Sequence, residues 1–510
     1  MKDLRVSARI YREKLLGDPY RPGYHFAIPD GNGVPGDSNG AFFADGRYHL
    51  MYLYWNESSE AFHWGHMSST DLLHWRNHPD CLTAERGDKG CFSGGAFVDD
   101  DQTAYLTFWK FESKDFPEDN GGIDIACSRP PYDKWERIRP IAINGSRDVW
   151  GTVDIEINGE IKHISCADPS NIWKHDGWYY MQTGNKCVLD EYGRAENAPQ
   201  EYKGDWTDLF RSRDMRTWEY VHRFYVNPKR GIDDWPDDTE DNMCPSFLPL
   251  PDRKRGGRLT DKWLQTFISH NKGAQYFIGT LQDEKFIPEQ HGRFSWNDNT
   301  YFAPENLIDD KNRQISWSWL LDNPDGDLEK YGWTGVYNFP RLFWYEDGML
   351  KMAPAEELDA LQYNPQSFEI NGAGKIAVKN GESFRIKADI CMNGASKAGF
   401  AVRCDDAHRQ YTEIYYDKAA GKLVFDATGS GSAGRPIREE APFELEDGEK
   451  LSLDIFVDKS VIEVYANERQ AICRRVFPDY PDRALGVRAI SNGADFGTVR
   501  AWEMSPTNPY

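Results

Sequence analysis

The strongest constraint on the fold is a series of short hydrophobic segments that come in pairs between residues 40 and 350. In AFFADGRYHLMYLYW and NIWKHDGWYYMQTG, two runs rich in aromatic residues flank a turn at Asp45-Gly46 or Asp176-Gly177. Such a turn between β-forming runs is typical of a hairpin. The hairpins recur at irregular spacing with polar inserts between them. We therefore predict a β-propeller of four-stranded blades for this part, with a β-sandwich as the alternative.

Two short segments of similar sequence indicate a repeated structure. SSTDLLHW near residue 70 and SRDMRTWEY near residue 215 share a Ser, an Asp, an apolar residue and a Trp.

A change of pattern marks a second domain. Residues 353–372 predict a short helical piece with Leu358 and Leu361 on one side, and the hydrophobic residues of later segments such as SFRIKADICM alternate with period 2. The prediction is an all-β chain, with a propeller over residues 1–360 and a β-sandwich over 361–510.

The composition excludes several classes of partner and favours a carbohydrate ligand. The 82 acidic residues outnumber the 60 basic ones, and this net charge of −22 argues against a nucleic-acid partner. No window approaches the roughly 18 apolar residues of a membrane span, and the N-terminus lacks a secretory pattern, so we expect a cytoplasmic protein without a membrane partner. The nine cysteines are scattered without a CxxC pair, which indicates neither a disulfide framework nor a zinc site. Aromatic and acidic residues together suit a small carbohydrate ligand. No cofactor or metal is expected, and the sequence leaves room for a homo-oligomer.

Acidic residues stand at the start of three predicted hairpins. Asp37 lies in GDSNG before the strand AFF, and Asp168 lies in CADP before NIWKHDGWYY. Taken alone, each motif is better explained by a turn residue whose carboxylate accepts backbone N–H bonds. The acidic run 233–250 is mainly a solvated loop, in which only Glu240 and Asp241 come close to the next strand. Together these residues would supply the two or three carboxylates that a glycosidase needs.

The HWGH segment looks like a metal site at first sight. His63 and His66 are three positions apart on a predicted strand, so they point to opposite faces, and no metal site is predicted. Trp64 between them is either a platform on which a sugar stacks or a core aromatic residue.

At these motifs the sequence resembles glycoside hydrolase family 32, the invertase, levanase and inulinase family. GDSNG is similar to the family's Asn-Asp-Pro-Asn-Gly turn, whose Asp is the nucleophile, and Trp64-Gly65-His66 is similar to its Trp-Gly-His block. Phe92-Ser93-Gly94-Gly95 resembles its Trp-Ser-Gly-Ser block, and Ala167-Asp168-Pro169 resembles the Arg-Asp-Pro motif, whose Asp stabilises the transition state. LSLDIFVDKSVIEVYANE extends the resemblance into the C-terminal part.

The resemblance implies a five-bladed β-propeller followed by a C-terminal β-sandwich, and a retaining mechanism on β-fructofuranosides. It implies substrate binding by Asn39, Trp64, Phe92 and Ser93. The implied reaction releases β-fructofuranosyl units from sucrose, fructo-oligosaccharides or fructans, with Asp37 as nucleophile and Asp168 as stabiliser of the transition state. The alternatives are a glycosidase or fructosyltransferase for a different furanoside, and a catalytically weakened sugar-binding propeller.

The main departure from the family concerns the proton donor. The family's acid is the Glu of Glu-Cys-Pro, and here Met243 takes that place before Cys244 and Pro245. Because methionine cannot donate a proton, Glu240 or Asp241 would have to replace it. Asp241 shares strand parity with Met243, whereas Glu240 has the longer reach and is preferred; Glu305 is a third candidate. Three further positions lose a hydrogen-bonding group: Gly36, Leu53 and Ala167.

Overall fold

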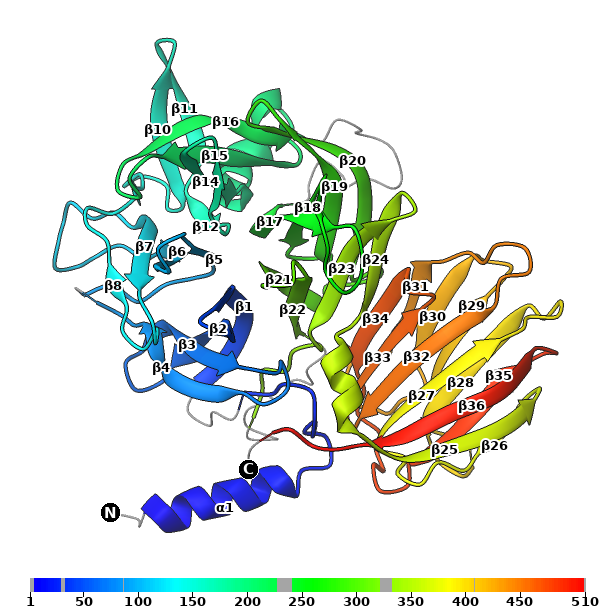
Figure 1. Ribbon diagram of the computed structural model, residues 1–510. Coiled ribbons are helices and arrows are strands. Elements are labelled where there is room, and N and C mark those ends of the chain that lie inside the picture. The colour runs from blue at the N-terminus through cyan, green and yellow to red at the C-terminus, as the bar shows by residue number, and fades with distance from the viewer. Residues whose placement is uncertain are drawn as a thin grey trace. The chain divides into compact units, whose positions relative to one another are not determined.

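The protein folds into two compact units of β-sheet (Figure 1). The computed structural model describes residues 4–28, 33–85, 87–226, 241–321, 333–407 and 409–508. One unit comprises residues 30–319 and 342–350, and the other comprises residues 1–29, 320–341 and 351–510. This partition differs from the expected domains 1–360 and 361–510, because the N-terminal segment and residues 320–341 cluster with the C-terminal part. Among the described residues, no helix is long and apolar enough to cross a membrane.

Five antiparallel sheets are arranged in a ring, which confirms the predicted five-bladed propeller (Figure 1). The strands of the first two blades are β1 (Gly33–Ala44), β2 (Arg47–Asn56), β3 (Ala61–Ser69) and β4 (Arg76–Leu82), then β5 (Ala96–Val98), β6 (Ala104–Lys110), β7 (Gly122–Ser128), β8 (Glu136–Arg137) and β9 (Ile143–Asn144). Those of the third and fourth are β12 (Ala167–Pro169), β13 (Trp173–His175), β14 (Trp178–Gly184), β15 (Trp206–Ser212) and β16 (Trp218–Val226), then β17 (Met243–Pro251), β18 (Leu259–Ser269), β19 (Gly273–Gln282) and β20 (Lys285–Arg293). The fifth comprises β21 (Tyr301–Ile308), β22 (Gln314–Leu320), β23 (Arg341–Glu346) and β24 (Met349–Pro354).

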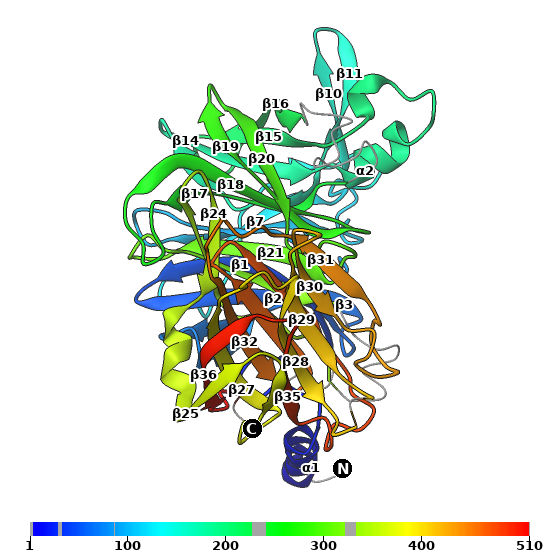
Figure 2. The same ribbon diagram turned by 90° about the vertical axis from the view of Figure 1, so that its right-hand side faces the viewer.

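A separate ribbon of β10 (Thr152–Ile157) and β11 (Glu160–Ser165) projects from the third blade (Figure 2). The short helix α2 (Lys186–Val188) and the π-turn Leu189–Gly193 follow β14, and α2 contacts β11 of this ribbon (Figure 2). These elements bring polar residues of the third blade to the rim of the cavity described below.

The two segments of similar sequence prove to be the same turn in two blades. Ser69 and Asp71 form it between β3 and β4, where the Asp71 N–H donates to the Ser69 hydroxyl at 3.1 Å. Ser212 and Asp214 form it between β15 and β16, with the corresponding bond at 3.2 Å. The apolar residue that follows the Asp has a left-handed backbone in both turns, with φ of 65° at Leu72 and 62° at Met215. The similarity in the sequence therefore reports a true structural repeat.

Several of the buried aromatic residues pack neighbouring blades together. Trp64 and Phe108 belong to a buried cluster of residues from the first two blades. Trp173, Phe224 and Phe247 belong to another, made by the third and fourth blades. Burial of one such ring contributes on the order of 2–3 kcal/mol, so the aromatic residues are first of all a stabilising feature of the ring of blades.

The first strands of three blades carry a register irregularity at matching places. The irregularity in β1 spans Asp37, that in β12 spans Asp168, and that in β17 spans Cys244. Asp168 and Cys244 have positive φ values of 38° and 46°. A bulge locally turns a side chain out of the alternating pattern, and here it directs each of the three side chains toward a shared cavity.

The C-terminal part is a sandwich of two six-stranded sheets, as predicted. One sheet contains β25 (Gln362–Asn371), β36 (Asp495–Met504), β27 (Ser383–Ile390), β32 (Leu451–Asp458), β33 (Val461–Ala466) and β34 (Gln470–Arg475). The other contains β26 (Gly374–Ile376), β35 (Gly486–Ser491), β28 (Lys397–Cys404), β29 (Thr412–Asp417), β30 (Lys422–Asp426) and β31 (Arg438–Pro442). The expected short helical piece is a 3₁₀ helix, Glu356–Leu361, with Leu358 and Leu361 buried.

The N-terminal segment after helix α1 (Leu4–Leu16) is tied to this sandwich by one buried carboxylate. Asp458 accepts three consecutive backbone N–H groups, from Gly23, Tyr24 and His25, at 2.6, 2.8 and 2.7 Å. The imidazole of His25 lies 3.1 Å from Asp458 and 3.6 Å from Glu463. These contacts explain why a segment far away in the sequence belongs to the same compact unit.

Candidate active site

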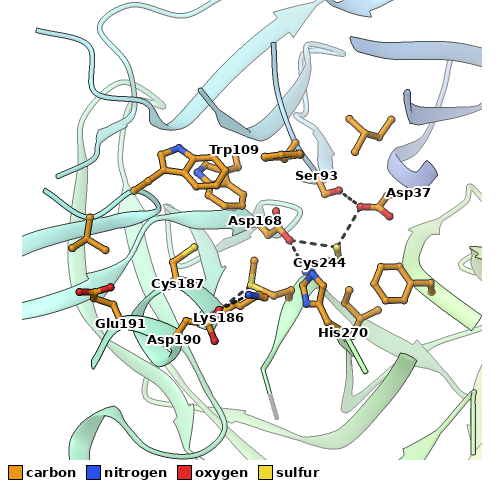
Figure 3. Close-up of a pocket in the computed structure, with 17 residues that line it drawn as sticks. Asp37, Ser93, Trp109, Asp168, Lys186, Cys187, Asp190, Glu191, Cys244 and His270 are labelled. Carbon is orange, nitrogen blue, oxygen red and sulfur yellow. Dashed lines mark hydrogen bonds and ion pairs between the residues drawn. The ribbon is translucent and has the colours of Figure 1, made fainter. Parts of the chain in front are cut away.

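A cavity of about 560 Å³ opens among the first strands of the blades (Figure 3). Asp37, Ser93, Asp168 and Cys244 line it and come from the first four blades, and Phe302 on β21 adds the fifth. The other lining residues are Leu53, Phe92, Trp109, Val149, Trp150, Lys186, Cys187, Asp190, Glu191, Met243, Ile268, His270 and Phe302. The volume falls within the range of small-molecule sites.

Two carboxylates, those of Asp37 and Asp168, lie next to each other in this cavity (Figure 3). The Ser93 hydroxyl donates to Asp37 Oδ2 at 2.5 Å. Cys244 Sγ lies 3.5 Å from Asp168 Oδ2 and 3.9 Å from Asp37 Oδ2, and the Cys244 N–H donates to Asp168 at 3.3 Å. The Cys244 thiol therefore lies between both carboxylates, and its single proton can be donated to either of them.

The proximity and burial of the pair change its titration. Burial raises the pKa of Asp37, which the hydrogen bond from Ser93 and the nearby His270 only partly oppose. Burial and the charge of Asp37 raise the pKa of Asp168 to about 6. Burial also raises the pKa of Cys244 well above its ordinary value, so the thiol stays protonated between the two acids. Shifted carboxyl groups within one cavity are a frequent property of catalytic sites.

Asn39 of the first blade stabilises the backbone next to Asp37. Asn39 is buried, its amide donates to the Asp37 carbonyl at 3.3 Å, and its side-chain oxygen accepts the Gly94 N–H at 3.3 Å. Asn39 does not line the cavity, so the structure gives it a supporting position. Ser93 and Phe92, which were also predicted to bind substrate, do line it.

The aromatic wall of the cavity is not the one expected from the sequence. Of its two expected roles, Trp64 has that of a core residue: it is 0% exposed and donates its indole N–H to the Phe92 carbonyl at 3.1 Å. The wall is made by Phe92, Trp109 and Trp150 instead. Trp150 is 41% exposed and stacks on Trp109 with ring centroids 4.1 Å apart, so it presents an accessible ring to the cavity.

The lining also includes Met243, which stands where the motif of the resembling family has its acid. Met243 lines the cavity, and its sulfur accepts the Lys186 N–H at 3.4 Å. Asp241 lies behind the lining, with its side chain only 5% exposed, and is bound to His270. Glu240 lies outside the described residues. The third candidate, Glu305, is buried and accepts the Ala41 N–H at 3.0 Å, so it joins the fifth blade to the first rather than lining the cavity.

The remaining polar groups at the rim form an ion-paired set. Lys186 and Arg194 both bind Asp190, and they hold the pKa of that carboxyl below its ordinary value despite the opposing effect of burial. Glu191 is exposed at the rim. Within the described part of the chain, no group of three or more His, Cys, Asp and Glu side chains is arranged to hold a metal ion. His63 contacts Asp80, whereas His66 contacts His49, as expected for opposite strand faces.

Sequence reasoning missed His270 and the aromatic pair Trp109 and Trp150. His270 directly follows β18, in a hairpin that the sequence did predict. The antiparallel register pairs Met243 with Ile268 and so sets Asp241 opposite His270. Asp241, two residues before Met243, could be recognised in the sequence as a candidate. Its contact with His270 could not, because it depends on the register between β17 and β18, which no turn motif reveals.

Comparisons with known proteins agree with this architecture. The N-terminal domain of glycosyl hydrolases family 32 matches residues 25–354, and the family's C-terminal domain matches residues 357–503. The chain is 24% identical to a sucrose-6-phosphate hydrolase of Zymomonas mobilis, over 97% of this chain and 94% of that protein. It is 25% identical to a levanase of Bacillus subtilis, over 99% of this chain and 74% of that protein.

Solved structures show the same fold. The crystal structure of fructan 1-exohydrolase IIa from Cichorium intybus superposes with a TM-score of 0.79 at 19% identity, covering 96% of this chain and 98% of that chain. Sucrose-6-phosphate hydrolase from Lactobacillus gasseri gives 0.76 at 21% identity, covering 99% and 98%. The family match spans both units, and its motifs place two carboxylates in one cavity. The chain therefore belongs to glycosyl hydrolase family 32 and is a glycosidase of the β-fructofuranosidase type, acting on fructose-containing sugars.

Proposed function

We propose that the protein is a retaining glycosidase that releases single β-fructofuranosyl units from sucrose or short fructans. The observation that carries this proposal is the pair Asp37 and Asp168, which lie on either side of one thiol in an aromatic-lined cavity. The relatives named as sucrose-6-phosphate hydrolase and levanase support a fructose-containing substrate. A cavity of about 560 Å³ suits one or two sugar rings, which favours attack at a chain end.

In the proposed mechanism, Asp37 attacks the anomeric carbon as the bond to the leaving oxygen breaks. Asp168 stabilises the positive charge that develops on the sugar ring in the transition state. Water then attacks the anomeric carbon and releases Asp37. Transfer of the fructosyl group to another sugar would use the same two carboxylates, with a hydroxyl group in place of water.

The direct test is turnover of a panel of sugars: sucrose, 1-kestose, inulin, levan and an arabinofuranoside. We expect free fructose from sucrose, 1-kestose, inulin and levan, and no free arabinose from the arabinofuranoside. In methanol–water mixtures, a retaining enzyme gives methyl β-fructofuranoside, which NMR distinguishes from the α-anomer. Product analysis at high sucrose concentration separates hydrolysis from transfer. Absence of turnover on every sugar would overturn the proposal.

The pH dependence of kcat/KM should report the carboxylate pair. Asp37 attacks only in its ionised form. Activity is therefore present above its raised pKa and is lost as the pH falls through that pKa. With the pKa of its neighbour Asp168 at about 6, we expect the acidic limb near this pH, above the limb of an ordinary aspartate near 4.

Ser93→Ala should shift this limb to higher pH, because the Ser93 hydrogen bond lowers the pKa of Asp37. Ser58→Ala, in an exposed turn, serves as the control and should leave the profile unchanged. An acidic limb that Ser93→Ala does not move would contradict the assignment of Asp37.

A further inference from the structure

The cavity contains Asp37 as the proposed nucleophile, but it contains Met243 at the motif position where the resemblance implies a carboxylic acid. A glycosidic oxygen is a poor leaving group unless it receives a proton as the bond breaks, and general acid catalysis contributes about 10²–10⁴-fold to such reactions. The proton donor must therefore be another group that borders the cavity.

Most ionisable groups of the cavity are unsuited to this task. Burial raises the pKa of Cys187 to about 12 and that of Cys244 well above its ordinary value, so both thiols are too weakly acidic. Asp190 is ion-paired, and its lowered pKa keeps it ionised. Lys186 is its partner. Asp168 receives the Cys244 N–H and lies beside Asp37, on the side of the nucleophile.

His270 differs from all of these in how it is held. Its Nδ1 lies 2.6 Å from Asp241 Oδ2, and its backbone N–H donates to Asp241 Oδ1 at 3.3 Å. Both oxygens of one carboxylate thus engage the same histidine. The ring of Phe302 packs against the imidazole edge-on, at 5.9 Å and 77°. These contacts fix the ring, and they leave Nε2 as the nitrogen that can exchange a proton with a bound sugar.

The placement of the pair suits a donor. The Asp241 side chain is 5% exposed, whereas the His270 side chain is 47% exposed and borders the cavity beside Cys244 (Figure 3). Asp241 is therefore shielded from the substrate and acts only through the imidazole. His270 directly follows β18 and Asp241 lies just before β17, so the two residues stand at neighbouring ends of adjacent strands, close to Met243 in the chain.

We propose that His270, held and oriented by Asp241, is the proton donor of the reaction, an assignment that rests on the function proposed above. As Asp37 forms its bond to the anomeric carbon, the bond to the leaving oxygen breaks and this oxygen takes the proton from His270 Nε2. In the second step, water attacks the anomeric carbon and gives a proton back to the neutral imidazole, while Asp37 leaves as a carboxylate. The cycle restores the imidazolium and the carboxylate, and it needs no further reactant.

The charged groups that face His270 favour the imidazolium. Burial alone lowers the pKa of His270, but the hydrogen bond to Asp241 and the charges of Asp241 and Asp168 outweigh burial and Lys186, and the net pKa is raised. Asp37 on β1 also faces it and is itself affected by the His270 charge. A donor with a raised pKa works at low pH and is lost as the pH rises through that pKa, so His270 should set the alkaline limb of the pH profile.

The test uses the whole protein and two leaving groups. His270→Gln should lower kcat/KM on sucrose by about 10²–10⁴-fold, but that on an aryl β-fructofuranoside by less than about tenfold, because an aryl oxygen leaves without a proton. With the aryl substrate, added azide should restore turnover of His270→Gln and give β-fructosyl azide. His74→Gln is the matched control, because His74 forms the same Nδ1 contact to Asp71, at 2.7 Å, on the surface. It should behave as the wild type.

Asp241→Asn provides a second, independent readout, since it keeps the shape but removes the negative charge. If Asp241 positions His270, Asp241→Asn should shift the alkaline limb to lower pH. If its role is merely structural, the substitution should reduce activity equally at all pH values. Glu240→Gln and Glu191→Gln are measured in parallel, on both substrates and with azide.

The outcomes are distinct. If the wild type turns over no fructofuranoside, the proposed function fails. If it is active and His270→Gln loses equal activity on both substrates without azide rescue, the assignment of His270 is wrong and the proposed function stands. The assignment also fails if Glu240→Gln or Glu191→Gln shows the dependence on leaving group and the rescue by azide instead.

Discussion

Asp37→Asn is expected to reduce kcat/KM on every substrate of the wild type by about 10⁴-fold or more, because removal of a covalent nucleophile removes the reaction path itself. The asparagine keeps the shape of the side chain and can still accept the Ser93 hydroxyl, so the fold should be unaffected. In contrast to His270→Gln, the loss should be equal for good and poor leaving groups and should not respond to azide.

A covalent intermediate gives this prediction a direct readout. Rapid acid quench of the wild type with an aryl β-fructofuranoside, followed by intact mass measurement, should show a fructosyl adduct, and peptide mapping should place it on Asp37. Asp176→Asn is the matched control, because Asp176 lies in an exposed hairpin turn with a φ of 48°, a conformation that asparagine adopts equally well. An Asp37→Asn variant within tenfold of the wild type would overturn the assignment of the nucleophile.

Glu463→Ala is expected to destabilise the C-terminal unit by about 3–5 kcal/mol, because it removes the carboxylate that is ion-paired with a buried cation. Arg341 donates to Glu463 Oε1 at 2.9 Å, and both side chains are 0% exposed. The other oxygen accepts the Phe339 N–H at 3.1 Å and lies 3.6 Å from His25. For a unit of this size, the loss corresponds to a decrease in Tm of roughly 10 °C, which differential scanning calorimetry detects.

The pH dependence of this effect has a definite sign. Burial opposes ionisation of Glu463, but the charge of Arg341 and the contact with His25 outweigh it and lower its pKa from 4.5 to about 2. Its contribution to the free energy of unfolding is therefore fully present above about pH 4.5 and is lost as the pH falls toward 2. The raised pKa of His25 acts in the opposite direction, with stability present below 6.5 and lost as the pH rises through the raised value.

Two variants make the stability prediction specific. Glu463→Gln removes the charge but keeps hydrogen-bonding capacity, so it should cost less than Glu463→Ala and should abolish the acid-dependent part. Glu446→Ala, at an exposed position, is the control and should change the free energy of unfolding by less than about 0.5 kcal/mol. A loss below about 1 kcal/mol for Glu463→Ala would show that the buried pair contributes little.

The sequence predicted the repeated architecture because its signals are local. Hairpin turns such as Asp45-Gly46 and Asp176-Gly177 specify their own strand pairs, and the Ser-x-Asp turns recur in two blades because the same short hydrogen bonds form in both. Asp37 and Asp168 were identified for a related reason, since each lies directly before a recognisable hairpin. Their approach within one cavity follows from the closure of the ring, which the family resemblance implied.

The remainder of the site depends on contacts between distant segments. The pairing of Asp241 with His270 follows from a strand register, and a sequence assigns either residue alone to a loop or strand end. Trp64 and Trp150 are equally aromatic in the sequence, yet one is buried between blades and the other is exposed. Glu305 has the chemistry of an acid, but its burial against Ala41 makes it a structural bond between blades. Burial and register, not residue type, separate these cases.

The matching bulges in β1, β12 and β17 separate the shape of the reaction centre from its chemistry. Each bulge interrupts the register of its strand pair at the residue whose side chain lines the cavity. Asp37, Asp168 and Cys244 therefore occupy interchangeable positions of one backbone pattern. A single substitution at any of them alters the charge and acidity at the centre without a new loop. A propeller of this kind can present a different set of reacting groups to its cavity by exchange of side chains at its bulges.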